Sequence, residues 1–139
     1  LRDADEETVR YSIEGYGIGL DLTLRDVQNR LKEKGHPWEI AKAFDGAAPL
    51  SGFIDARGVS VKQQLKLSLA VNGDVRQSGH TGLMLWPTFA LIAHISRHFT
   101  LLPGDVVFTG TPAGVGPLHS GDKLQVRLGN ILSVTGEVA

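Results

Sequence analysis

The chain has 139 residues, which is enough for one domain with a hydrophobic core but small for two. A formal net charge of −1 gives no electrostatic basis for binding nucleic acid or an anionic membrane. No apolar run approaches the roughly 20 residues that cross a bilayer, no signal peptide is visible, and the absence of cysteine excludes disulfide and thiolate chemistry and fits a cytoplasmic protein.

The first residues predict a polar helix over 4–14, capped by Asp3 or Asp5, with Val9 and Ile13 facing inward. The chain starts at Leu1, without a methionine, and enters this helix at once. We therefore expect a cut end, either because the protein is truncated or because a disordered N-terminal part precedes Leu1.

The stretch from Tyr16 to Gln28 predicts a strand, a tight turn at its end and the start of a helix. Apolar residues occupy its even positions as far as Leu22, whereas glycines and then Asp21 occupy the odd ones. Thr23 is placed as the helix N-cap, and the apolar stripe that follows leaves Arg25 and Gln28 as neighbours on another face. A carboxylate, a guanidinium and an amide are thereby expected at one corner.

Residues 38–62 have no clean period and predict an ordered loop rich in small residues, with Lys42 as its basic side chain. The alternation over 65–71, followed by Asn72-Gly73, predicts a hairpin through a type I′ turn that returns over 75–78. Residues 85–99 predict a helix with Phe89, Ile92, Ile95, Ser96 and Phe99 on one side.

The last part of the chain predicts a short apolar strand over 106–109, a glycine-rich turn from Thr109 to Pro117, and two closing strands over 123–128 and 131–138. No repeat or linker divides the chain. We therefore expect one domain, residues 1–139, of the α+β class.

Asp21 is the best candidate for a metal ligand or a general base, because a carboxylate beside glycines can bind a hard cation. The plainer alternatives are a cap for the next helix or a partner for Arg25. Arg25, Gln28 and Lys42 could hold an anionic substrate, Arg25 as a bidentate clamp and Lys42 as a point charge. For each of these three, a solvated surface position is the alternative.

The turn TGTPAGVG offers backbone N–H groups and the hydroxyls of Thr109 and Thr111, which can bind a carboxylate or phosphate; otherwise it is a structural turn. It lacks the Lys-Ser or Lys-Thr pair of a P-loop. His94 and His98 have the i,i+4 spacing of a zincin, but no glutamate follows His94, so the alternative is ordinary helix residues. No G-x-S-x-G motif supports a serine hydrolase.

Four segments in order, GLDLTLRDVQ, KGHPWEIAKAFDGAAPLSGF, VNGDVRQSG and GDVVFTGTPAGVGP, resemble the C-terminal core of the fumarylacetoacetate hydrolase family. The likeness covers nearly all of residues 4–139, and it is greatest to short bacterial members related to acylpyruvate hydrolases and to the isomerase/decarboxylase of homoprotocatechuate breakdown. It implies a mixed β-roll of the α+β class, a homodimer, and one Mg²⁺ or Mn²⁺ held by three carboxylates.

The resemblance also implies roles for individual residues. Asp21 matches the third metal ligand, and Arg25, Gln28 and Lys42 match substrate-contacting positions, with Lys42 and Gln28 as the catalytic pair. Thr111, with Thr109 and Gly110, matches the turn that receives the substrate carboxylate. The implied substrates are 2-oxo acids such as acylpyruvates or oxaloacetate-like diacids, which a hydrolase, decarboxylase or isomerase converts through a metal-stabilised enolate.

The chain departs from the family pattern at its start. The family's other two ligands form a Glu-x-Glu pair upstream of the first helix, and a histidine–glutamate lid lies further upstream. Glu6 and Glu7 are adjacent, so they do not replace this pair. We expect the 139 residues alone to bind metal poorly and to turn over little. The alternative is a non-catalytic domain that keeps a carboxylate pocket without the metal.

Overall fold

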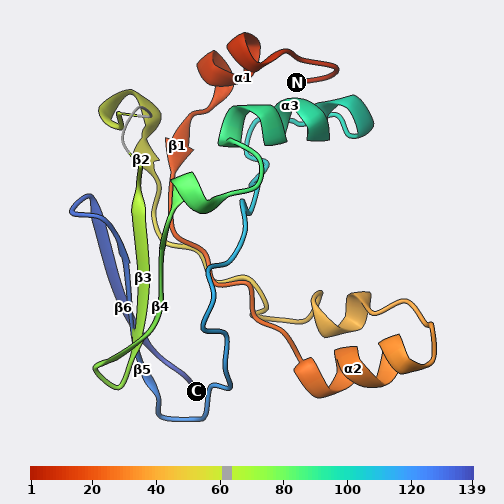
Figure 1. Cartoon of the computed structure of the whole chain (residues 1–139), viewed down its shortest axis with the longest axis vertical. Helices are drawn as coiled ribbons and strands as arrows, with labels where there is room; N and C mark the ends of the chain where they lie inside the picture. The colour runs from red at the N-terminus through yellow and green to blue at the C-terminus, as the bar shows by residue number, and fades with distance from the viewer. Residues whose placement is uncertain (61–63) are drawn as a thin grey trace. The chain divides into compact units, whose positions relative to one another are not determined.

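The structure is a computed structural model that describes residues 1–60 and 64–139. The chain forms two compact units, drawn in Figure 1 and described here one at a time. The larger comprises Leu1–Ile18 with Gly52–Ala139, and the smaller comprises Gly19–Ser51. The last two residues of the loop predicted over 38–62 lie outside the described residues. Among the described helices, none has the length and apolar character needed to cross a membrane.

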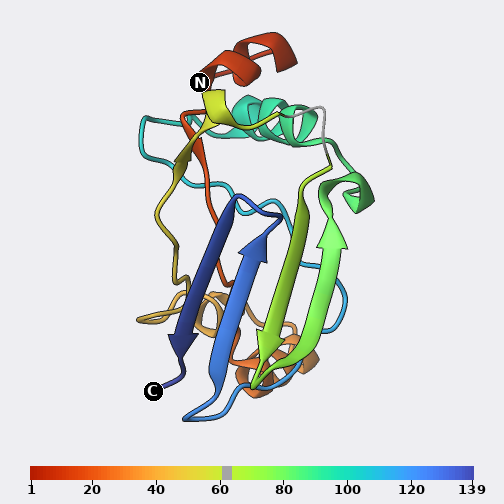
Figure 2. The same cartoon turned by 90° about the vertical axis from the view of Figure 1, so that its left-hand side faces the viewer.

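A four-stranded antiparallel sheet forms the base of the larger unit (Figure 2). Its strands, in spatial order, are β4 (Asp74–His80), β3 (Lys66–Val71), β5 (Lys123–Leu128) and β6 (Leu132–Glu137). The central pair, β3 and β5, joins distant parts of the sequence and places Leu69 opposite Val126. Apolar side chains on these two strands are buried at Val71, Val126 and Leu128.

Both predicted hairpins of this sheet are confirmed. Asn72 has φ 53° and Gly73 has φ 91°, the two positive angles that a type I′ turn requires. β4 continues to His80, beyond the predicted end, and the register with β3 shifts between Leu69 and Ala70. The second hairpin joins β5 to β6.

Two helices form the apolar core of the larger unit. Helix α1 (Glu6–Ser12) begins at Asp5, whose side chain accepts a hydrogen bond from the backbone N–H of Thr8 at 2.8 Å, as an N-cap does. Its Val9 is fully buried and belongs to one cluster with Ile92 and Ala93 of helix α3 (Thr88–His98). The predicted cap and the inward position of Val9 are therefore confirmed.

Ser96 fixes the start of the chain against α3. Its side chain is fully buried, accepts a hydrogen bond from the backbone N–H of Ala4 at 2.9 Å, and donates one to the carbonyl of Ala93 at 2.8 Å. The buried hydroxyl thus both accepts and donates a hydrogen bond, which offsets the free-energy cost of removing it from water. The remaining elements of this unit are β1 (Gly15–Tyr16), which pairs with β2 (Ile54–Asp55), and two 3₁₀ turns, η2 (Ala56–Gly58) and η3 (Thr81–Leu83).

The smaller unit contains helix α2 (Arg25–Glu33) and the 3₁₀ turn η1 (Glu39–Ala41). Gly35 ends α2, because it has φ 63° and its N–H donates to the carbonyl of Lys32 at 3.0 Å. An isolated antiparallel bridge joins Gly19 to Leu50, where the two ends of the unit meet.

Four local predictions are wrong. The strand predicted from Tyr16 onward is limited to β1 and the bridge at Gly19. The strand predicted over 106–109 is absent among the described residues, where this segment has no ladder partner. Helix α3 starts at Thr88 rather than at residue 85, because Pro87 disfavours helical geometry in the residue before it. Phe99 was expected to face inward but is 67% exposed.

The α+β class is confirmed, with short helices and antiparallel sheets. The structure adds a feature that the residue pattern did not reveal, namely the separate compact unit over Gly19–Ser51. This unit contains the corner at which the sequence placed most of its candidate site residues.

Candidate active site

An extended segment leading into α2 is held in place by the returning loop of the smaller unit. Three alternate backbone N–H groups donate at 2.9–3.0 Å, from Leu20 to Pro49, from Leu22 to Ala47 and from Leu24 to Ala41. Ala41 and Ala47 are buried, so small side chains allow this close approach. The pairing fixes the backbone on both sides of Asp21 and Thr23 and also fixes the residue before Lys42.

Lys42 joins the two segments through its side chain. Its ammonium donates to a carboxylate oxygen of Asp21, forming an ion pair, and to the hydroxyl of Thr23 at 2.9 Å. The side chains of Lys42 and Asp21 remain 30% and 44% exposed, so both can still meet a small molecule. The structure therefore brings together an acid and a base that are 21 positions apart in the sequence.

Thr23 does not cap α2, which corrects the prediction. The N-cap is Leu24, which makes no capping side-chain bond, and the Thr23 hydroxyl accepts from Lys42 instead. Sequence spacing alone could not find this role, because the signal of a threonine before a helix is the same in both cases. The partner lies on a different segment that only the folded chain brings near.

Arg25 and Gln28 contact each other on the first turn of α2, as their i,i+3 spacing predicted. The guanidinium of Arg25 donates to the amide oxygen of Gln28 at 2.6 Å. Gln28 is only 4% exposed, whereas Arg25 is exposed. The buried amide therefore holds an otherwise mobile guanidinium, which retains further N–H donors for an anion.

A hollow of about 260 Å³ lies beside Lys42 and is lined by Trp38, Glu39, Lys42 and Ala43. Lys32 stacks over the ring of Trp38 at 4.9 Å from its centroid, so a second cation lies on this aromatic wall. The volume lies just below the usual range of ligand pockets, about 300–1,000 Å³, so only a small molecule such as a short organic acid would fit.

The glycine-rich turn belongs to the larger unit, where it lies against β4. The side-chain amide of Gln77 donates to the carbonyl of Pro112 at 2.8 Å. A Cβ atom at Gly79 would lie 3.1 Å from Pro112, and one at Gly114 would lie 1.9 Å from the carbonyl oxygen of Arg76. Close approach of the turn to β4 thus favours glycine at both positions, and Gln77, which lies in the VNGDVRQSG segment, positions Pro112.

The three predicted ligand-binding residues of this turn, Thr109, Gly110 and Thr111, are all exposed. Gly110 has φ 127°, a conformation in which glycine is strongly favoured. Their hydroxyls and backbone N–H groups can therefore be reached by a ligand. Binding by these residues stays a prediction.

A sequence profile described as "Fumarylacetoacetate (FAA) hydrolase C-terminal" matches residues 1–139. The chain belongs to the fumarylacetoacetate hydrolase family. The resemblance inferred from the four sequence segments is therefore confirmed.

Relatives within this family carry related activities in their names. The chain is 58% identical over 127 residues to the oxaloacetate tautomerase YcgM of Escherichia coli, covering 91% of this chain and 58% of that protein. It is 40% identical over 124 residues to the mitochondrial oxaloacetate tautomerase of Homo sapiens, covering 89% of this chain and 56% of that protein. The chain thus spans less than two thirds of the length of either relative.

Solved structures of the family agree with the fold. A crystal structure of fumarylpyruvate hydrolase from Pseudomonas aeruginosa in complex with Mn²⁺ and pyruvate superposes with a TM-score of 0.93 at 37% identity, covering 99% of this chain and 59% of that one. A family protein from Yersinia pestis superposes with a TM-score of 0.94 at 50% identity, covering 100% of this chain and 65% of that one.

The donor set around Asp21 fits one ligand of a hard divalent cation rather than a complete site. Its carboxylate offers the oxygen chemistry that Mg²⁺ and Mn²⁺ prefer, but one oxygen already accepts from Lys42. Within residues 1–60 and 64–139, no group of three His, Cys, Asp or Glu side chains could hold a metal ion. A complete metal site would therefore need ligands beyond this set.

Proposed function

We propose that the protein is a divalent-metal-dependent enzyme that interconverts the keto and enol forms of oxaloacetate or a closely related 2-oxo diacid. The observation that carries this proposal is the Asp21–Lys42–Thr23 cluster beside a hollow that suits a small acid. Support also comes from the 58% identity to an oxaloacetate tautomerase, which exceeds the 37% identity to the fumarylpyruvate hydrolase.

Arg25 is assigned to a substrate carboxylate. A guanidinium can bind a carboxylate through two parallel hydrogen bonds, and Gln28 already orients it through the 2.6 Å contact. The backbone N–H groups and hydroxyls of Thr109–Thr111, in the larger unit, are separately assigned to binding a carboxylate.

Lys42 is assigned to proton transfer and to stabilising the enolate. In the enol-to-keto direction the enol oxygen loses its proton to water, and the adjacent carbon accepts a proton from the Lys42 ammonium. The amine then regains a proton from solvent, so the balance closes. Asp21 and Thr23 orient the ammonium, since they accept two of its three donors and leave the third for the substrate.

Asp21 is proposed as one ligand of the metal, with Mg²⁺ or Mn²⁺ as the ion. When bound, such an ion supplies a Lewis acid that stabilises negative charge on the enolate. Mn²⁺ is present in the fumarylpyruvate hydrolase structure, which supports this class of cofactor. The homodimer and the cytoplasmic location stay predictions.

The test compares single substitutions with matched controls in the complete gene product. Tautomerisation is followed by the loss of enol absorbance with Mg²⁺ or Mn²⁺ present. Lys42→Met should lower kcat by about 10²–10⁴, the usual contribution of a general acid or base, while Lys34→Met on the exposed end of α2 should leave it unchanged. Asp21→Asn should abolish the metal dependence, while Asp26→Asn should keep it.

Full activity of Lys42→Met would remove that side chain from the mechanism.

Acylpyruvate hydrolysis is the second candidate, favoured by the likeness to fumarylpyruvate hydrolase. It is distinguished by release of fumarate and pyruvate from fumarylpyruvate and water. A protein that binds oxaloacetate but accelerates neither reaction would instead support the non-catalytic domain.

A further inference from the structure

Helix α3 presents two histidines, one turn apart, on its exposed side. His94 and His98 are both exposed, and their ring centroids lie 5.1 Å apart at an interplanar angle of 65°. Trp86 contacts His94 from the other direction, with centroids 4.7 Å apart at 66°. The three rings form a row, here called the His94–His98 row, at the surface of the larger unit.

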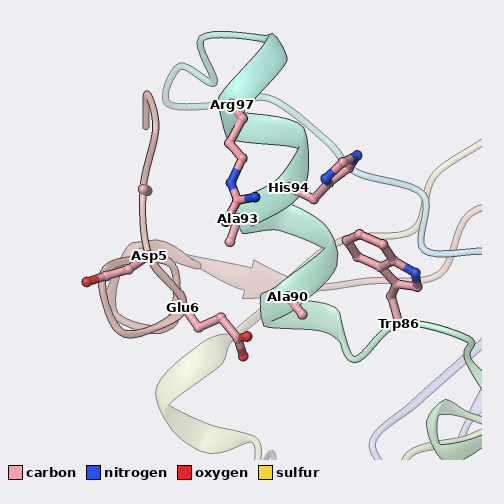
Figure 3. A pocket seen from close by; sticks show the side chains of 8 residues that line it. Asp5, Glu6, Trp86, Ala90, Ala93, His94 and Arg97 are labelled. Carbon is pink, nitrogen blue, oxygen red and sulfur yellow. The ribbon is translucent and has the colours of Figure 1, made fainter.

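This row is separate from the face with which α3 packs. Ile92, Ala93 and Ser96 supply the buried face. Figure 3 shows Trp86 and His94 on one side of α3 and Arg97 and Glu6 on the side next to α1; all four side chains line one hollow of about 400 Å³. Both imidazoles are exposed and lie outside the buried residues of the helix.

We propose that His94 and His98 form a binding site for a borderline divalent transition ion, in the class of Cu²⁺, Ni²⁺ and Zn²⁺. Two imidazole nitrogens that each approach one such ion at about 2.0–2.1 Å, with a near-tetrahedral angle between them, require ring centroids about 5 Å apart. The observed 5.1 Å meets this condition. Rotation of the rings about their own side-chain bonds is then sufficient, without movement of the backbone.

The chemistry of this site differs from that proposed at Asp21. Imidazole nitrogen favours copper, nickel and zinc, whereas carboxylate oxygen favours magnesium and manganese. The described residues offer no group of three His, Cys, Asp or Glu ligands, so water completes the coordination here. The affinity should then follow the general order for divalent ions, with Cu²⁺ bound more tightly than Ni²⁺ or Zn²⁺.

Trp86 provides a direct readout, because bound Cu²⁺ quenches the fluorescence of a nearby indole. Trp38→Phe leaves Trp86 as the single tryptophan, since the chain has two. Titration of this variant with Cu²⁺ alone should give saturable quenching with one ion per chain. Loss of even an outer partner of a metal ligand lowers affinity about 10–100-fold, so His94→Ala and His98→Ala should each weaken binding at least tenfold.

The matched controls are His119→Ala, an exposed histidine outside the row, and Asp21→Asn, which removes the other proposed ligand. Both should leave the Cu²⁺ affinity unchanged, and the second separates failure of this site from failure of the proposed function. The electron paramagnetic resonance spectrum of the Cu²⁺-loaded wild-type protein should show two imidazole nitrogens. Equal quenching in both histidine variants and wild type, or a spectrum without paired nitrogens, overturns the proposal.

Discussion

Replacing Gly114 by alanine tests whether the glycine-rich turn is fixed against β4. The added Cβ would lie 1.9 Å from the carbonyl oxygen of Arg76, although such atoms essentially never come within 3.0 Å of another group. Gly114 also has φ 98°, a conformation that costs an L-residue about 1–2 kcal/mol. Because the neighbour is backbone within a sheet, relief requires the turn itself to move by about 1 Å, which places this change among the severe ones.

Substitutions at two other glycines distinguish the effect of the steric clash from the effect of backbone strain. Gly104 has φ 92° but nothing within 4 Å of its Cβ position, and Gly116 has neither a positive φ nor a neighbour. Gly116→Ala should therefore change the free energy of unfolding by less than about 1 kcal/mol. Gly104→Ala should cost about 1–2 kcal/mol, and Gly114→Ala about 3 kcal/mol or more, since strain and overlap add.

Urea denaturation of the three variants, followed by circular dichroism, measures these differences. If Thr111 binds a substrate carboxylate as proposed, movement of the turn should also raise KM for Gly114→Ala alone. Equal losses for Gly114→Ala and Gly104→Ala would refute the contact between the turn and β4, since only the strain would then have been detected.

Three smaller predictions follow from individual hydrogen bonds. Thr23→Val should leave the free energy of unfolding nearly unchanged but lower kcat, because the hydroxyl serves Lys42; a loss of about 1 kcal/mol in urea unfolding would instead mark it as a cap. Ser96→Ala should cost about 1–3 kcal/mol in the same assay, because it leaves the N–H of Ala4 unpaired. Hydrogen bonds from the backbone N–H of His119 and, to a lesser extent, from the amide of Asn72 lower the pKa of Asp122 in the folded protein. The ionised carboxylate therefore stabilises the folded state fully above the ordinary carboxyl pKa of about 3.9. This stabilisation is lost as the pH falls through the lower pKa of the folded state. Asp122→Asn should therefore be less stable than wild type at pH 7, and the difference should shrink in unfolding measured near pH 3.

Local signals predicted the parts of the fold that depend on local interactions. The Asn72-Gly73 pair determines its hairpin because both residues tolerate positive φ, and Asp5 caps α1 through a hydrogen bond three residues along the chain. By contrast, the pairing of β3 with β5 joins residues more than 50 positions apart. No periodicity in either strand specifies that partner, so it could not be read from the sequence.

The candidate site likewise combines contacts that are local in sequence with contacts between distant segments. The contact between Arg25 and Gln28 follows from helical spacing and was expected. The contact of Lys42 with Asp21 and Thr23 depends on how a loop without clean periodicity returns beside the segment before α2. Resemblance to a family placed these residues in one site, but only the structure shows which atoms meet.

The Asp21–Lys42 pair constrains how a cation and a substrate could share this corner. A divalent ion approaching the carboxylate meets the positive charge of Lys42, which already occupies one oxygen. Both side chains are partly exposed, so solvent reduces the repulsion without removing it. With Asp21 as a proposed metal ligand, the hydrogen bond from Lys42 to the Thr23 hydroxyl would hold the ammonium in place and leave a donor for the substrate. Thr23 would therefore matter most where Asp21 serves both the ion and Lys42.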